Sequence, residues 1–139
     1  MTSPNLRSIA ADSNVLLAAI AGRAALRVFD RLELQVVTTE ENLVEVREKL
    51  PQFAARYGIA EEELFHSLAL LPVTTYVKRQ YASHIFEARS LLAARDPDDV
   101  PLAALALKLG IPVWSNDRDF DDFPTGIYST AKLIKVLGV

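Results

Sequence analysis

The residues of this sequence best placed to do chemistry are carboxylates near the ends of predicted strands. Asp12 directly follows a short apolar strand, Asp117 follows the fourth predicted strand, and Asp99 begins the helix that leads into that strand. Parallel strands bring their carboxyl ends to one edge of a sheet, where ligands bind in α/β proteins. Glu45, about one turn into the helix after the second strand, can face the same edge if that helix packs beside the first strand. The sequence therefore predicts a site of four carboxylates.

Four carboxylates in one small pocket need positive charge, because like charges a few ångströms apart raise one another's pKa and destabilise the fold. Arg47 is the only cationic residue within two positions of Asp12 or Glu45. Hard divalent cations are the simpler compensation, and an all-oxygen ligand set suits Mg²⁺ or Mn²⁺. Zinc is not expected, since the sequence has no Cys and two isolated His. One or two such ions would activate water and stabilise a phosphoryl group during in-line displacement, as in nucleases and phosphatases.

Each of these carboxylates also has a purely structural interpretation. Asp12 and Asp99 precede helices and suit the capping position, where a carboxylate accepts hydrogen bonds from backbone N–H groups. Glu45 lies on a charged helix and fits a solvated face. Asp117 belongs to an acidic stretch that could be an exposed loop. Only the joint placement of the four at strand ends favours a metal site.

The elements that position these residues alternate between strand and helix. Small or β-branched apolar runs predict strands, and apolar residues at helical spacing predict helices. The predicted strands cover 8–11, 34–37, 73–77, 111–115 and 126–129. Three of the predicted helices begin after Asp12, Thr38 and Asp99, and three more cover 61–71, 79–94 and 132–137. This alternation predicts one layered α/β domain over residues 1–139, with a largely parallel five-stranded sheet.

Local signals indicate how two of these helices begin, end and pack. Thr38 and Glu41 have the spacing of a capping box at the start of the second helix. Pro51 should stop or kink that helix, since an interior proline removes a backbone donor and clashes with the preceding turn. In the helix over 79–94, the apolar residues expected to pack inward are Ile85, Phe86, Ala88, Leu91 and Leu92.

Composition limits the class of protein. The chain has 139 residues, and 15 Lys and Arg against 18 Asp and Glu give a formal net charge of −3. A pI near 5.4 argues against coating of nucleic acid by bulk charge, although it permits an enzyme that grips phosphate through metal ions. Without Cys, disulfides and thiol nucleophiles are excluded, and a cytoplasmic location is expected. The apolar run at 15–21 is too short for a membrane span, so no membrane partner is expected.

Around these carboxylates the sequence resembles PIN-domain nucleases along almost the whole chain. Residues 9–17, IAADSNVLL, look like the D-T/S-N-V-L-L opening of that family, and Glu45 fits its helical Glu. The block RDPDD at 95–99, followed by AALA at 103–106, resembles the family's D-x-x-D…A-x-A pattern. Residues 114–120, WSNDRDF, resemble its closing T-x-D-x-D-F. The length also resembles that of single-domain bacterial and archaeal PIN proteins, many of them toxins of VapBC-type toxin–antitoxin pairs.

The resemblance implies a three-layer α/β/α, Rossmann-like fold with a central, mainly parallel five-stranded sheet. It also implies a Mg²⁺- or Mn²⁺-dependent endoribonuclease that cuts single-stranded RNA, pairs with a small antitoxin protein and forms a homodimer. The residues that it assigns to catalysis and metal binding are Asp12, Glu45, Asp99 and Asp117, with Asp119 and Asp96 as outer or alternative metal ligands. Asp99 is preferred to Asp96 as the third ligand, because it begins a helix that holds its carboxylate at a defined place.

Four further residues are assigned supporting or substrate-binding roles. By the same resemblance, Asn14 would orient Asp12 or the substrate, and Ser115 keeps the hydroxyl of the family's Thr. Arg118 and Arg95 flank the acidic motifs, where they would contact RNA phosphates or form solvated salt bridges.

Two other functions are compatible with the same residues. In a phosphatase or receiver-like domain, Asp12 would accept a phosphoryl group beside a Mg²⁺ site. That chemistry needs a Lys or Thr partner at a later strand end, for which Ser115 is a weak substitute. In a non-catalytic PIN-like interaction module, an acidic ligand is usually lost, whereas all four acidic positions are filled in this chain.

Overall fold

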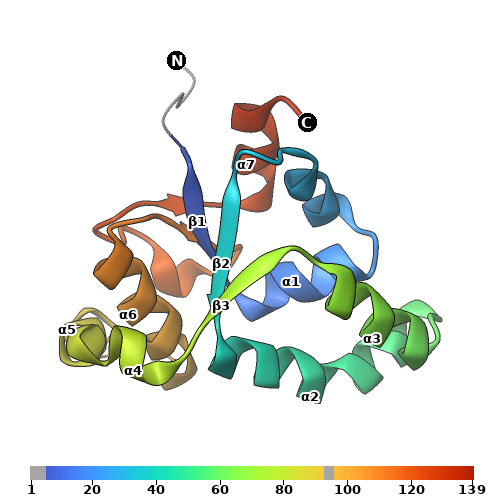
Figure 1. The fold of residues 1–139 in the computed structure, drawn as a ribbon, viewed down its shortest axis with the longest axis horizontal. Helices are drawn as coiled ribbons and strands as arrows, with labels where there is room; N and C mark the ends of the chain where they lie inside the picture. The colour runs from blue at the N-terminus through green and yellow to red at the C-terminus, as the bar shows by residue number, and fades with distance from the viewer. Residues whose placement is uncertain (1–5, 93–95) are drawn as a thin grey trace.

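Five parallel strands form a central sheet in the order β3-β2-β1-β4-β5, so β1 lies in the middle (Figure 1). The computed structural model describes residues 6–92 and 96–139. Every pairing between neighbouring strands is parallel. The strands are β1 (Ser8–Ala11), β2 (Gln35–Thr39), β3 (Val73–Tyr76), β4 (Val113–Trp114) and β5 (Ile127–Tyr128). The predicted five-stranded parallel sheet is confirmed, although β4 and β5 are shorter than predicted.

Helices connect the strands and cover the sheet. The α-helices are α1 (Ser13–Ile20), α2 (Glu40–Tyr57), α3 (Glu61–Leu70), α4 (Lys78–Tyr81), α5 (Ile85–Leu91), α6 (Val100–Leu109) and α7 (Thr130–Leu137). Short 3₁₀ segments are η1 (Ala24–Asp30), η2 (Ala82–His84), η3 (Pro97–Asp99) and η4 (Arg118–Phe120). Within the described ranges, no helix combines the length and the apolar character needed to cross a membrane.

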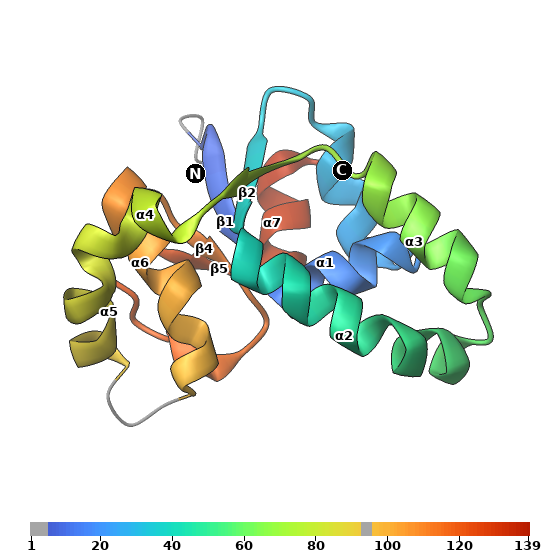
Figure 2. The ribbon, with the colours of Figure 1, turned by 60° about the horizontal axis from the view of Figure 1, so that its bottom comes forward.

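The core divides into two clusters, one on each face of the sheet, because successive side chains of a strand point to opposite faces. On β1, Ile9 and Ala11 contribute to one cluster and Ala10 to the other. The first cluster is completed by buried residues of α1, α2, α3, η1 and α7, and the second by residues of α4, α5 and α6. Figure 2 shows these two sets of helices on either side of the strands. The three-layer α/β/α architecture is confirmed.

The start of α2 differs from the prediction by one residue. Thr39 is the N-cap, and its hydroxyl oxygen accepts a hydrogen bond from the backbone N–H of Asn42 at 2.9 Å. Thr38 still belongs to β2, and its hydroxyl donates to the carbonyl oxygen of Ala11 at 2.9 Å. The capping box predicted from Thr38 and Glu41 is therefore wrong, because strand pairing extends two residues beyond the apolar run, to Thr39.

Pro51 does not stop α2, which continues to Tyr57 and ends at Gly58 with a φ of 65°. The missing hydrogen bond to the carbonyl of Arg47 is tolerated because Leu50 and Ala54, on the two sides of the proline, are both buried. Pro51 itself is exposed. Packing of the buried stripe thus outweighs the local cost of the proline, which is about 3 kcal/mol in a helix interior.

Replacing this proline is expected to stabilise the protein. Pro51→Ala restores a backbone donor and removes a ring clash, so the free energy of unfolding should rise by about 1–3 kcal/mol. Urea denaturation followed by circular dichroism measures the change. The control is Gln52→Ala, an exposed substitution on the same helix that leaves the backbone hydrogen bonds intact. An unfolding free energy equal to that of the control would contradict the prediction.

The single helix predicted over 79–94 is wrong, because the chain forms α4, η2 and α5 instead. Within α5, Phe86 lies about 200° around the helix axis from Ala88, so the two side chains cannot both face the core. Ala88 and Leu92 are buried as predicted, whereas Phe86 is 82 % exposed and Leu91 is 42 % exposed. The last two predicted residues of this helix, 93 and 94, lie outside the described residues.

Candidate metal centre

The candidate site lies at the carboxyl ends of β1 and β4, where the strand order reverses around β1. The chain leaves β1 to form β2 on one side, and β4 pairs with β1 on the other. Asp12 follows β1 and is the N-cap of α1, while Asp117 follows β4 and is the N-cap of η4. This is the crevice in which parallel α/β sheets bind ligands.

Asp12 is held by two hydrogen bonds and is only 6 % exposed. Its Oδ1 accepts from the backbone N–H of Ser13 at 2.8 Å, and its Oδ2 accepts from the hydroxyl of Ser115 at 2.8 Å. The Ser115 hydroxyl oxygen in turn accepts from the backbone N–H of Asp117 at 3.0 Å. Ser115 therefore connects the loop after β4 to the carboxylate after β1. Asp12 is therefore both the N-cap of α1 and a residue of the candidate site.

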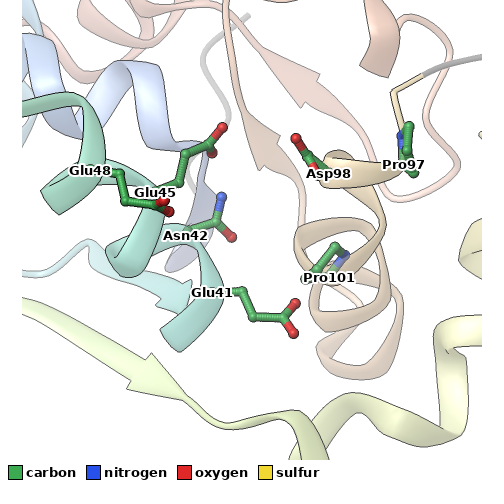
Figure 3. Close-up of a pocket in the computed structure, with 7 residues that line it drawn as sticks. All are labelled: Glu41, Asn42, Glu45, Glu48, Pro97, Asp98 and Pro101. Carbon is green, nitrogen blue, oxygen red and sulfur yellow. The ribbon is translucent and has the colours of Figure 1, made fainter.

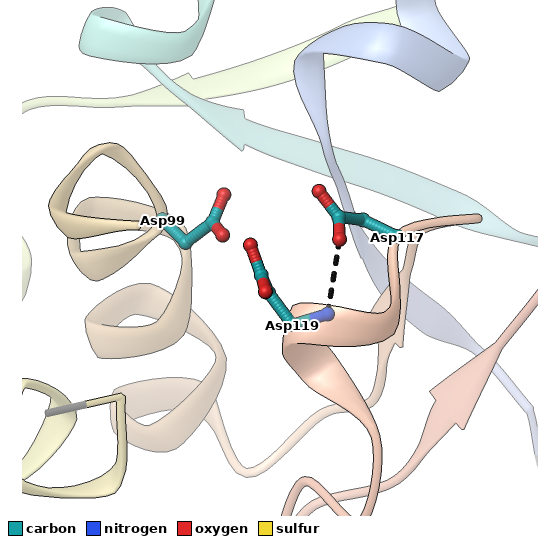
Figure 4. A group of neighbouring side chains, drawn as sticks. All are labelled: Asp99, Asp117 and Asp119. Carbon is teal, nitrogen blue, oxygen red and sulfur yellow. Dashed lines mark hydrogen bonds between the residues drawn. The ribbon is translucent and has the colours of Figure 1, made fainter. Parts of the chain in front are cut away.

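Asp99, Asp117 and Asp119 bring carboxylate oxygens within 4.8 Å of one another. Figure 4 shows Asp99, at the start of α6, facing the two residues from the loop after β4. Asp117 Oδ1 accepts a hydrogen bond from the backbone N–H of Asp119 at 3.0 Å. Asp99 is buried, Asp119 is half-buried and Asp117 is exposed. Oxygen ligands at this spacing suit a small hard cation such as Mg²⁺ or Mn²⁺.

The electrostatics join Asp12 to this cluster. Burial raises the pKa of Asp99 to about 8, and the neighbouring carboxylates of Asp12, Asp119 and Asp117 add to the increase. Burial also raises the pKa of Asp12, against the effect of its hydrogen bonds, and nearby Glu45 and Asp117 contribute. In addition, Asp99 Oδ2 is buried and has no hydrogen-bond partner among the described residues. A bound cation would satisfy this oxygen and relieve the repulsion.

Glu45 lines an acidic pocket between α2 and the start of α6 (Figure 3), and its charge contributes to the raised pKa of Asp12. The pocket has a volume of about 320 Å³ and is lined by Glu41, Asn42, Glu45, Glu48, Pro97, Asp98 and Pro101. Four of the seven lining residues are carboxylates, so a phosphate group would be repelled here without a cation. Glu45 pairs with Lys49 at 3.1 Å, one helical turn further along α2. Lys49 is thus a nearby cation that lies four positions from Glu45 along the chain, further than the two positions within which Arg47 was found.

The other predicted site residues lie outside this cluster. Asp96 is exposed and accepts a hydrogen bond from the backbone N–H of Asp98 at 2.9 Å. Asn14 is exposed on α1, in a groove shared with α2. The side chain of Arg118 is 94 % exposed, and its Nε lies 3.6 Å from Oδ2 of Asp121. This contact is the solvated salt bridge that was one of the two roles expected for Arg118. Arg95 lies outside the described residues.

A buried polar network that the sequence analysis missed connects α1 to α2. Asn42 Nδ2 donates to the hydroxyl oxygen of Ser13 at 2.8 Å, and Asn42 Oδ1 accepts from the Thr39 hydroxyl at 2.6 Å. The Ser13 hydroxyl donates to the Asn42 carbonyl at 3.3 Å. All three residues are buried. The available signal was an Asn in the first turn after a Thr cap, a position where Asn often bonds locally. Glu45 follows one turn later.

The chain matches the family model of the PIN domain over residues 11–133. Its structure is similar to VapBC2 from Rickettsia felis bound to a promoter DNA fragment, with a TM-score of 0.69, 13 % identity, and coverage of 88 % of this chain and 98 % of that one. A toxin–antitoxin complex from Klebsiella pneumoniae is similar with a TM-score of 0.65, 18 % identity, and coverage of 86 % and 96 %. No curated protein matches the chain. The family match extends from the end of β1 to α7 and spans the whole carboxylate cluster, so this chain belongs to the PIN domain family.

Proposed function

We propose that this protein is a Mg²⁺- or Mn²⁺-dependent endoribonuclease that cleaves single-stranded RNA and acts as the toxin of a toxin–antitoxin pair. Proteins of the PIN domain family are nucleases. The observation that carries the proposal is the cluster of Asp99, Asp117 and Asp119, with Asp12 buried beside it.

The residues of the cluster fit a divalent metal. Asp12, Asp99, Asp117 and Asp119 would hold it, and Glu45 would complete the acidic set from α2. The buried, unpartnered Oδ2 of Asp99 supports this ligand set. When bound, such an ion supplies an activated water and neutralises charge at the phosphodiester. The products expected from attack by water are a 5′-phosphate and a 3′-hydroxyl.

The chain's own residues contribute position and charge. Ser115 fixes the Asp12 carboxylate relative to the loop that carries Asp117. The backbone N–H of Asp119 fixes the Asp117 carboxylate in the same way. Because burial and the neighbouring carboxylates raise the pKa of Asp99, binding of a cation would displace protons from this cluster.

The phosphoryl-acceptor alternative is disfavoured by the surroundings of Asp12. A phosphorylated aspartate needs one carboxylate oxygen free to attack. Both oxygens of Asp12 accept hydrogen bonds, and the residue is 6 % exposed. Asp12 is therefore better suited to hold a cation than to attack a phosphoryl group.

The proposed partner is a small antitoxin protein, as in the Rickettsia and Klebsiella complexes, and the proposed assembly of the toxin is a homodimer. Co-expression of this chain with the products of the genes that flank its own, followed by affinity purification, tests the pairing. Size-exclusion chromatography with light scattering tests the dimer. Failure to co-purify, or the mass of a monomer, would contradict the respective proposal.

The nuclease proposal is tested by incubating the protein with end-labelled single-stranded RNA in Mg²⁺, in Mn²⁺ and in EDTA. Cleavage is expected with either metal and not in EDTA, and the products should carry 5′-phosphates. The matched control is the Asp117→Asn protein, purified in parallel, which should lack this activity. Equal cleavage by both proteins, or no cleavage by the wild type with either metal, would contradict the proposal.

A further inference from the structure

A groove on the surface between α1 and α2 differs in charge from the acidic pocket beside it. It has a volume of about 260 Å³ and is lined by Asn14, Leu17, Lys49, Gln52, Phe53 and Arg56. Its lining contains two cations, two amides and an aromatic ring, and no carboxylate. A groove of this composition favours an anionic, partly apolar ligand.

The groove is continuous with the acidic site. Glu45 lines the acidic pocket, Lys49 lines the groove, and their side chains form an ion pair at 3.1 Å. Residues three and four apart share one face of a helix, so Gln52 and Arg56 continue the face that carries Lys49. From Glu45 to Arg56 the helix rises by about 16 Å. The groove therefore leads from the carboxylates along α2.

Aromatic and guanidinium groups meet at the far end of the groove. The rings of Phe53 and Tyr57 have centroids 4.7 Å apart. The guanidinium carbons of Arg23 and Arg56 lie 5.1 Å and 5.6 Å from the Tyr57 ring centroid. Tyr57 is 38 % exposed. Among the described residues, neither of these arginines forms an ion pair with a carboxylate, so their charge is available to a ligand.

We propose that this groove, with Tyr57 and Arg23 at its end, binds single-stranded RNA on one side of the cleavage site. The inference rests on the proposed function and names the path of its substrate. Lysine and arginine hold phosphates, and aromatic rings with stacked guanidinium groups provide the platforms on which unpaired bases stack. An acidic peptide could bind the cations but would make no use of the aromatic pair. A groove that served such a peptide would also not need to lead to the carboxylates.

The test compares a groove variant with a control that removes the same charge elsewhere. The groove variant is Arg23→Gln with Arg56→Gln, and a second variant is Tyr57→Leu. The control is Arg79→Gln with Lys108→Gln, two exposed residues on α4 and α6 in the opposite helical layer. Equal thermal midpoints of these proteins check that all of them fold.

Binding is measured in EDTA, where no cleavage occurs, by the fluorescence anisotropy of a labelled single-stranded oligouridylate. The groove variant should bind about tenfold more weakly, and the slope of log affinity against log salt should fall by about 1.4, the value for two lost phosphate contacts. Tyr57→Leu should also weaken binding about tenfold, by loss of stacking. The control should remain within about twofold of the wild type. In the cleavage assay, the groove variant should raise KM and leave kcat unchanged.

Two outcomes would overturn the inference while leaving the nuclease intact. In the first, the wild type cleaves RNA, and the groove variant has the same RNA affinity and the same KM as the control variant. The second is a groove variant that loses binding of a polyglutamate peptide but not of RNA, which would make the groove a protein-docking surface. Failure of the proposed function is distinct, since it would show as a wild type that does not cleave RNA with either metal.

Discussion

Asp12→Asn is expected to lower the rate of RNA cleavage by about a thousandfold, which corresponds to roughly 4 kcal/mol of lost transition-state stabilisation. The substitution removes one negative charge from the centre of the carboxylate set and replaces one oxygen with a donor that cannot bind a cation. It changes neither the size of the side chain nor its backbone conformation. The loss should therefore appear in cleavage and in metal affinity rather than in folding.

The contacts of Asp12 explain why the fold should survive this change. The amide oxygen of Asn can accept from the backbone N–H of Ser13, as Oδ1 of Asp12 does. The amide N–H₂ can then donate to the Ser115 hydroxyl oxygen, because that hydroxyl rotates freely. Burial also raises the pKa of Asp12, so removing its charge relieves a cost of folding.

Single-turnover cleavage and a thermal midpoint measured on the same sample check this prediction. The matched control is Ser115→Ala, which keeps the charge of Asp12 and removes the hydroxyl that orients it. The cleavage rate of Ser115→Ala should fall by about 10- to 100-fold, as expected when a group that orients a metal ligand is removed. Full activity of Asp12→Asn would exclude this residue from the site.

Asp99→Asn is expected to stabilise the metal-free protein by several kcal/mol near pH 8, with about 5 kcal/mol as the upper limit from linkage, and to abolish its stabilisation by metal. The folded-state pKa of Asp99 is raised to about 8 from an ordinary value of 3.8. A group with a raised pKa contributes stability that is fully present below the unfolded-state pKa and is lost as the pH rises through the folded-state pKa. The wild type should thus lose stability between pH 4 and pH 8, whereas the variant should not.

The advantage of the variant should grow across that interval and level off above it. Thermal melts at several pH values in EDTA measure this difference. A second series in Mn²⁺ should reduce the difference, because a ligand at 100 times its Kd stabilises the wild type by about 2.7 kcal/mol and leaves the variant unchanged. The control Asp122→Asn removes an equal charge from an exposed position with a φ of 62°, which Asn tolerates. Equal pH profiles for the wild type and Asp99→Asn would contradict the prediction.

The sheet and the meeting of the carboxylates could be predicted from the sequence, because both follow from strand alternation. A parallel sheet places residues that follow its strands at one edge, and this rule predicts that Asp12 and Asp117 lie close together. The position of Asp99 at a helix start limited its carboxylate to the same region. Glu45 could be placed at the same edge only on the condition that its helix packs beside the first strand, and the resemblance to PIN-domain nucleases supported that placement.

The continuation of α2 through Pro51, the exposure of Phe86 and the Asn42 network depend on tertiary packing, which sequence patterns do not show. Pro51 is tolerated because Leu50 and Ala54 are buried on one stripe, which is a tertiary effect. Phe86 and Ala88 lie on opposite sides of α5, and only the packing shows that Ala88 faces the core while Phe86 is exposed. The Asn42 network needs Ser13 at hydrogen-bond distance from a second helix, and spacing along the chain does not show that distance.

The pairing of β1 with β4 also determines when, during synthesis, the protein becomes competent. Ala11 pairs with Trp114, and Asp12 receives its hydrogen bond from Ser115, so each contact joins residues more than one hundred positions apart. Because a chain emerges from the ribosome with its N-terminus first, Asp12 and Glu45 emerge long before the strand that aligns them, and Asp99 emerges 14 residues before that strand. A nascent chain that ends before β4 therefore carries most of the acidic residues but no assembled centre.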